Sequence, residues 1–306
     1  MADLREKVRE ELKKYWGKGD FHAYSDKYQY YVSDVNENLF GEGMLEVHRK
    51  MFEEGSGSEL EDIPAKAKAI DSSSMLSYNF FRNINKDYSV EIDGIEYNKV
   101  LFEVKLRTLK VRSSPANMDV VLVSKDKETV LFIESKFLEY LENGSADFSD
   151  SYIKQDSYYT DENEECSDLL EMSKKFQNKR DRYNYGIKQN ICHLIGISNL
   201  RQSKKAREWF EKNYNKLLEE YGAILKAKSY RFLNILFVPK QEDAYDCCTK
   251  YMNDLENSYI PENIRKNYIG KTYIMTYREL YNKLSNTLPT AIQDYLNNRY
   301  IKFHHE

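Results

Sequence analysis

The sequence predicts an α/β protein with a mixed central sheet flanked by helices. Three strand-like segments rich in Val, Ile, Leu and Phe follow one another between residues 97 and 137, and two more occur at 231–239 and 271–277. Helical segments precede, separate and follow them, which is typical of α/β proteins. The segments 117–123 and 129–137 are apolar on both faces, as expected for strands in the middle of a covered sheet.

The first part of the chain, residues 1–60, is predicted to be an N-terminal helical extension. Residues 1–16 are typical of an exposed helix with mixed charges, whereas 17–43 are rich in Tyr, Asp and Gly and show little periodicity. A second helix is expected over 44–54, because the sequence Gly55-Ser56-Gly57-Ser58 breaks the helical pattern.

The next element is a helix predicted over 71–84, which Asp71 or a following serine can cap. Its apolar residues recur at helical spacing, at Met75, Leu76, Phe80 and Ile84. The period then changes to two over 97–109, which predicts a strand with two different faces. One face is expected to carry Val100, Phe102, Val104 and Leu106, and the other Glu103, Lys105 and Arg107.

The later elements alternate between helix and strand. The polar stretch 124–128 is expected to be a short hairpin connection, and 142–182 is polar, with one helix around 166–180. Further helices are predicted at 183–198, 201–226, 245–256 and, as the final one, 278–284. The strand at 231–239 ends at Pro239, and the last strand covers 271–277.

The composition is that of a soluble globular protein, with 41% hydrophobic residues, 31% charged residues and a net charge of −4. This charge differs from that of a protein that coats DNA, although a local basic stripe is sufficient for phosphate contacts. The N-terminus lacks an apolar signal core, and no apolar run approaches the ~20 residues of a membrane span. We therefore expect a cytoplasmic, bacterial-type protein with no membrane partner. The four cysteines show no zinc-ligand spacing, so reduced thiols are expected.

Two acids and a lysine are predicted to meet at the open end of the hairpin. If the hairpin is symmetrical about the midpoint between Asp126 and Lys127, Asp119 lies directly opposite Glu134. Opposed residues of an antiparallel pair point to the same face with close Cβ atoms. Lys136 shares that face because it lies two positions beyond Glu134.

This group has an electrostatic cost that a metal ion removes. Two carboxylates that face each other on apolar strands repel one another and are partly desolvated. Mg²⁺ takes oxygen ligands from one or two carboxylates together with water and substrate phosphate, and it acidifies bound water. A lysine beside it supplies a compact charge for a nucleophilic water or for the phosphate.

The segments PANMDVVLV and FIESK together resemble the signature of the PD-(D/E)XK nuclease superfamily, in which an acid begins the second core strand and E-x-K ends the third. The resemblance covers about residues 71–240 and implies a restriction-endonuclease-like core of order α-β-β-β-α-β. Residues 61–306 are then a nuclease-like domain with a C-terminal α/β addition. The literal Pro-Asp pair is absent, since Pro115 lies four positions before Asp119; this departure is common in the superfamily.

The resemblance also implies roles for individual residues. Asp119 and Glu134 are expected to bind Mg²⁺ or Mn²⁺, aided by the carbonyl of Ser135, while Lys136 positions or activates water. Gln189, on the helix 183–198, resembles a glutamine that some branches of the superfamily place near the metal. A buried amide satisfied by the backbone is the alternative for Gln189.

Several neighbouring residues are open to two interpretations. His193 is expected to be a packed core histidine rather than a ligand. Glu103 is expected to belong to a solvated strand face, with a third carboxylate for the site as the alternative. Three basic segments are expected to be solvated helix faces, with phosphate contacts as the alternative: Lys174-Lys175, Lys179-Arg180-Asp181-Arg182, and Arg201 to Arg207.

The function expected from these observations is metal-dependent hydrolysis of phosphodiester bonds, with DNA favoured as the substrate and endonuclease action favoured over exonuclease action, in restriction or defence. Because cutting both strands often requires a dimer, a homodimer is one expectation. One alternative is a catalytically silent nuclease fold that binds nucleic acid or a protein. Another is an interaction protein whose acidic loop (161–171) binds a basic partner.

Overall fold

A computed structural model describes residues 2–17, 21–41, 43–55, 59–111, 113–141, 148–177, 184–215, 218–257 and 259–305. It contains a six-stranded sheet in which the strands lie in chain order. The strands are β1 (Val90–Ile92), β2 (Ile95–Leu106), β3 (Ala116–Ser124), β4 (Thr129–Lys136), β5 (Ser229–Leu236) and β6 (Ile274–Thr276). The first four pair antiparallel, whereas β4–β5 and β5–β6 pair parallel. The sheet is therefore mixed, and the α/β prediction is confirmed.

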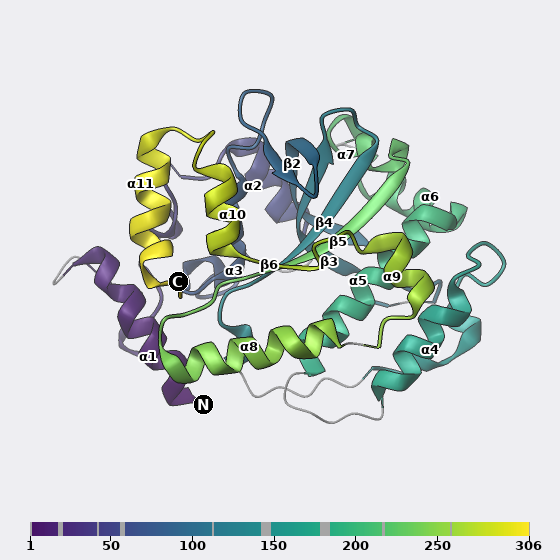
Figure 1. Cartoon of the computed structure of the whole chain (residues 1–306), viewed down its shortest axis with the longest axis horizontal. Coiled ribbons are helices and arrows are strands. Elements are labelled where there is room, and N and C mark those ends of the chain that lie inside the picture. The colour runs from purple at the N-terminus through teal and green to yellow at the C-terminus, as the bar shows by residue number, and fades with distance from the viewer. Residues whose placement is uncertain are drawn as a thin grey trace.

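Helices cover the sheet on both faces (Figure 1). On one face, α2 (Glu46–Glu54) contacts β2 and α3 (Ser73–Phe81) contacts β3 and β4. On the other face, α5 (Asn184–Gln202) contacts β2, β3 and β5. Adjacent residues of β4 show the two faces, because Ser135 bonds to Ser73 of α3 whereas Lys136 bonds to Gln189 of α5.

The remaining helices extend this arrangement. In Figure 1, α8 runs below the sheet and α1 lies beside it at the lower left. These helices are α1 (Ala2–Lys13), α4 (Cys166–Gln177), α6 (Lys204–Asn213), α7 (Leu218–Lys226), α8 (Glu242–Glu256), α9 (Glu262–Tyr268), α10 (Tyr277–Leu284) and α11 (Thr290–Arg299).

The predicted register of the central hairpin is confirmed from Val120 to Val123 of β3. Val120 pairs with Ile133, and Val123 pairs with Val130, as the expected symmetry requires. The next residues outward are Asp119 and Glu134, at the open end of the hairpin. A short polar connection between two apolar strands is sufficient to set this register, because a shift of one residue would turn every side chain to the other face.

The prediction of a single helix over 201–226 is wrong, because α6 and α7 are separate helices. Ser203 begins α6 by accepting a hydrogen bond from the backbone N–H of Ala206 at 3.1 Å. Tyr214 follows the end of α6 and stacks on Tyr221 of α7, with ring centroids 4.1 Å apart. Its hydroxyl oxygen also accepts a hydrogen bond of 2.6 Å from the backbone N–H of Lys105 in β2. Because Tyr214 contacts both α7 and β2, α6 and α7 cannot form one continuous helix.

Three short elements were not predicted, and 278–284 is not the final helix. The missed elements are β1, α9 and α11, which span three, seven and ten residues. Both α9 and α11 begin after a proline, Pro261 and Pro289. Short segments carry too few repeats of an apolar pattern to be distinguished from loops by periodicity alone.

The expected alternation of β2 is interrupted at Glu103. Phe102 faces α2 and α3, where its ring lies 5.1 Å from that of Tyr78. Leu106 faces the opposite helix, α5, since its Cβ lies against the backbone of Gly196. Regular alternation would place Phe102 and Leu106 on one face. They lie on opposite faces because Glu103 adopts the left-handed conformation, with φ of 53°.

Candidate active site

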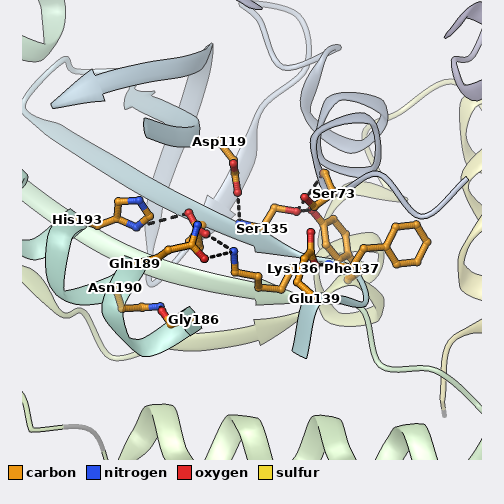
Figure 2. A network of polar contacts seen from close by, with 12 residues as sticks. Ser73, Asp119, Ser135, Lys136, Phe137, Glu139, Gly186, Gln189, Asn190 and His193 are labelled. Atoms are coloured by element: carbon orange, nitrogen blue, oxygen red, sulfur yellow. Dashed lines mark hydrogen bonds and ion pairs between the residues drawn. The ribbon is translucent and has the colours of Figure 1, made fainter. Parts of the chain in front are cut away.

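A cavity of about 620 Å³ opens where β4 ends and β3 begins. Its wall includes Glu103 of β2, Asp119 of β3, and Glu134 and Lys136 of β4. Gln189 of α5 lies on the same wall. Four strand residues and one helix residue that the sequence singled out therefore lie around one cavity. Figure 2 shows Lys136 directed toward Gln189, and Asp119 directed toward the backbone of Ser135.

Lys136 is held between two acceptors. Its ammonium group donates to a carboxylate oxygen of Glu134 and, at 2.9 Å, to the amide oxygen of Gln189. Glu134 and Lys136 are only 1% and 5% exposed. Burial opposes the charged form of Lys136, but the carboxylates of Glu134 and Glu139 together outweigh it, and the pKa of Lys136 is raised above its ordinary value. Lys136 is therefore a permanent cation.

Asp119 lies beside this pair and is oriented by the backbone. The N–H of Ser135 donates a hydrogen bond of 2.7 Å to one carboxylate oxygen of Asp119, as Figure 2 shows. Burial, and then the neighbouring Glu134 carboxylate, raise the pKa of Asp119 well above its usual range. Two ionised carboxylates at this place would repel one another, which is the cost expected from the hairpin register.

Glu103 is a third carboxylate of the cavity, and the prediction that it lies on a solvated face is wrong. It is 3% exposed, lies between the pairs Phe102–Val120 and Val104–Met118 and so opposite Asp119, and accepts a hydrogen bond from Asn117. Burial and the charges of Glu59 and Glu134 raise the pKa of Glu103 to about 8. An acid between two apolar neighbours in a strand was the only signal in the sequence.

Two residues of α5 contact the acid and the lysine of β4. The amide oxygen of Gln189 accepts from Lys136, so the alternative of an amide satisfied by the backbone does not describe it. His193 packs on Phe232 with ring centroids 5.7 Å apart, as expected of a core histidine, but its Nδ1 also lies 3.4 Å from Glu134. Burial lowers the pKa of His193, so a neutral ring faces that carboxylate.

Ser135 points its side chain away from Lys136. Its hydroxyl lies 2.6 Å from the hydroxyl of Tyr277 and donates to the carbonyl oxygen of Ser73 at 3.2 Å. The strand is thereby tied to α3 and α10 on the face opposite α5. The expected role of the Ser135 carbonyl as a metal ligand stays a prediction.

A family model described as "Restriction Endonuclease associating with ARP" matches residues 3–301. The chain belongs to this restriction-endonuclease family. Neither a curated protein nor a solved structure matches the chain. The family match begins within α1, so it includes the N-terminal segment as well as the strands that carry the cavity.

The oxygen-rich wall of this restriction-endonuclease family member fits a hard divalent cation. One carboxylate oxygen of Glu134 is buried without a hydrogen-bond partner, although a buried charged oxygen normally has one. The other donors at hand are the carboxylates of Asp119 and Glu103. In the described part of the chain, no three His, Cys, Asp or Glu side chains lie close enough together to enclose an ion, whereas Mg²⁺ needs only one or two carboxylates when water and substrate phosphate supply its other ligands.

Two arginines of α1 also line the cavity. Arg5 and Arg9 of α1 both pair with Asp71, at 2.7 Å and 3.0 Å. Asp71 therefore pairs with α1, whereas Ser72 caps α3 by accepting from the N–H of Met75. The prediction that 1–16 is an exposed helix is wrong, because Val8 and Leu12 are buried in the core and α1 supplies part of the cavity wall.

The other charged segments lie away from the cavity or outside the described residues. Lys179-Arg180-Asp181-Arg182 lies outside them. Lys174 and Lys175 are exposed, as expected of a solvated helix face. In the acidic loop, Glu162 and Glu165 bond internally, to Ser203 and Ser198 at 2.6 Å each, which weighs against this loop as a docking site. Over the described residues, no helix is long and apolar enough to span a bilayer.

Proposed function

We propose that this protein is a metal-dependent nuclease that hydrolyses phosphodiester bonds, with DNA as the favoured substrate. The observation that carries the proposal is the meeting of Asp119, Glu134 and Lys136 in one cavity, with Gln189 bonded to the lysine. Membership of a restriction-endonuclease family supports DNA as the substrate. The order α3, β2, β3, β4, α5, β5 supports the α-β-β-β-α-β core of PD-(D/E)XK nucleases.

The carboxylates have the role of metal ligands in this proposal. Asp119 and Glu134, with the carbonyl of Ser135, would hold Mg²⁺ or Mn²⁺, and Glu103 is available as a third carboxylate. When bound, the ion acidifies a water molecule and neutralises charge on the phosphate. The Ser135 N–H fixes Asp119, and the neutral ring of His193 leaves the free oxygen of Glu134 without a competing cation.

Lys136 has the role of a charged hydrogen-bond donor. Because its pKa is raised, it holds its proton at neutral pH and does not remove one from water. It positions the attacking water or stabilises the extra negative charge that develops on the phosphate during attack. Gln189 keeps the ammonium group directed toward the acids, since the amide accepts one of its three N–H bonds.

The proposal is tested by cleavage of supercoiled plasmid and of single-stranded DNA with Mg²⁺, Mn²⁺ or EDTA. We expect metal-dependent cleavage by the wild type, and a loss of at least 100-fold in Lys136→Ala, on the order of one electrostatic catalytic contact. Lys125→Ala is the matched control, because Lys125 lies at the closed end of the same hairpin and forms an exposed ion pair with Glu96 at 3.0 Å. Equal cleavage by all three proteins would assign the activity to a contaminant.

A catalytically silent nuclease fold is the second candidate. It is favoured by the bond between Lys136 and Glu134, which occupies one carboxylate oxygen that an ion would use. Divalent metal is expected to raise the melting temperature of an active nuclease, and Asp119→Ala is expected to abolish that rise. A protein that shows neither a thermal shift nor cleavage is the silent form.

We further propose a protein partner from the description of the family, which names association with ARP. A homodimer that brings two cavities to a duplex stays a prediction. Size-exclusion chromatography with light scattering measures the mass of the protein alone and with DNA. A mass of one chain under both conditions would contradict the dimer.

A further inference from the structure

The proposed reacting groups lie deep in the protein. Glu103 and Glu134 are 3% and 1% exposed, so a phosphodiester that reaches them must enter the cavity. Two paired strands are bulky and stiff, whereas the backbone of a single strand bends and its bases turn outward. The depth of the site therefore favours a single strand or an unpaired end over an intact duplex.

The arginines of α1 are the groups in the cavity that suit a phosphate next to the scissile one. Arg5 and Arg9 place two positive charges around the negative charge of Asp71, and Glu59, Lys66 and Glu139 line the same cavity. Arg9 lines the cavity with its side chain 16% exposed. A planar guanidinium is suited to phosphate oxygens.

A row of tyrosines leads outward from the cavity. Tyr31 lines the cavity, the ring of Tyr28 lies 5.5 Å from that of Tyr31, and the ring of Tyr24 lies 6.1 Å from that of Tyr28. Tyr24 is 38% exposed. Two lysines accompany the row, with Lys27 5.1 Å from the Tyr28 ring and Lys68 4.8 Å from the Tyr24 ring.

We propose that Arg9 and the tyrosine row form a track that binds single-stranded DNA and directs it into the cavity. The proposal rests on the proposed function for its substrate class. Aromatic rings with interspersed cations are the combination that binds single strands without sequence readout, because every base has a face that stacks and every phosphate has a charge. The track consists of Arg9, Lys27, Lys68, Tyr24, Tyr28 and Tyr31.

Binding is measured by fluorescence anisotropy in EDTA, so that it does not depend on cleavage. The probe is a fluorescein-labelled strand of about 20 thymidines, longer than the binding sites of most single-strand modules. A blunt duplex of the same length is the comparison. We expect the single strand to bind at least about 10-fold more tightly than the duplex.

Four variants locate the track. Tyr24→Ala is expected to weaken binding about 10-fold, the effect of losing one stacked base, and Tyr24→Phe is expected to retain binding because it keeps the ring. Arg9→Gln is expected to lower the slope of log K against log salt by about 0.7, the value of one phosphate contact on a single strand. Tyr259→Ala is the matched control, since Tyr259 is 42% exposed on the connection after α8.

Two results would overturn the track. One is duplex binding as tight as single-strand binding by the wild type. The other is unchanged affinity in Tyr24→Ala and Arg9→Gln, with thermal melting showing both variants folded. A wild type that binds the single strand in EDTA but never cleaves it with metal leaves the track in place and removes only the proposed function.

Discussion

Glu103 combines a left-handed backbone conformation with burial beside two further acids. A φ of 53° is uncommon for a residue with a long side chain. Such conformations persist where the surrounding structure holds them, and they cluster at functional sites. In β2, the conformation of Glu103 interrupts the alternation of side chains between the two faces of the sheet and directs its carboxylate toward Asp119 and Glu134. In the metal-free protein, the raised pKa of Glu103 therefore keeps this acid protonated at neutral pH.

The first prediction concerns the pH dependence of stability. The pKa of Glu103 is about 8, against an ordinary value of 4.5, so between these values the folded protein binds more protons than the unfolded chain. Its contribution to stability is lost as pH rises from about 4.5 to 8. Glu103→Gln is expected to stabilise the metal-free protein by on the order of 2 kcal/mol at pH 7.

Denaturant titrations at several pH values with EDTA check this prediction. The difference between wild type and Glu103→Gln should vanish near pH 4, where the carboxylate is protonated in both states. With excess Mg²⁺ the order should reverse at neutral pH, because the variant lacks one negative charge that attracts the ion. A variant less stable than the wild type in EDTA at pH 7 would show that the pKa of Glu103 is not raised by folding.

The second prediction concerns the support of Lys136 by α5. Gln189→Ala removes one of the two acceptors of the buried ammonium group. A hydrogen bond to a charged group contributes about 1.5–3 kcal/mol, so we expect cleavage to slow roughly 10- to 100-fold. Gln202→Ala is the control, since Gln202 ends the same helix and accepts from the N–H of Glu164. Equal rates for both variants would leave Gln189 without a role in catalysis.

At the scale of elements, the close approach of α5 to β2 depends on one glycine. A Cβ built on Gly196 would lie 2.7 Å from the Cβ of Leu106, closer than two carbon atoms allow. The missing side chain lets α5 pack tightly on the sheet. Gln189 and His193 are carried on the same helix, so this contact sets the distance between them and β4.

The third prediction uses two helical glycines as a pair. Gly196→Ala is expected to destabilise the protein by about 1–3 kcal/mol, because the added methyl group overpacks the contact with Leu106. Gly222→Ala in α7 meets no atom within 4 Å and is expected to stabilise it by up to about 1 kcal/mol through helix propensity. Urea unfolding of both variants measures the two values; the same sign for both would contradict the packing argument.

At the scale of the whole molecule, the N-terminal segment and the strands contribute to one core. Leu12 of α1 is fully buried, and Phe52 of α2 stacks on Phe102 of β2 at 5.6 Å. Arg5 and Asp71, 66 residues apart in the chain, close one side of the cavity. The division into an extension of residues 1–60 and a domain of 61–306 stays a prediction, and unfolding experiments test it.

The fourth prediction is that the chain unfolds as one cooperative unit. Leu12→Ala should destabilise the whole transition by about 2–5 kcal/mol, the cost of truncating a buried leucine. Leu45→Ala, at a residue that is 47% exposed, should change it by less than about 0.5 kcal/mol. Far-ultraviolet circular dichroism and tyrosine fluorescence should report coincident curves. A second transition that Leu12→Ala does not shift would show an independent domain.

The sequence by itself determined the features that depend on pairing between neighbouring segments of the chain. The hairpin that carries Asp119, Glu134 and Lys136 could be predicted because a short turn and two apolar strands specify the register between neighbours in the chain. The mixed sheet and the helix that carries Gln189 could be predicted from the spacing of the apolar residues and from the lengths of the segments. The resemblance to PD-(D/E)XK nucleases indicated the family for the same reason, since its motif lies within these adjacent strands.

Only the tertiary structure decided which distant residues complete the cavity. Glu103 turns into the site through one left-handed residue that alternation cannot predict. Arg5 and Arg9 reach Asp71 from a helix whose charges look like those of any solvated face. The break between α6 and α7 likewise follows from the packing of Tyr214 on Tyr221. Contacts across tens of residues depend on how whole elements pack, and no local pattern of charge or hydrophobicity records that packing.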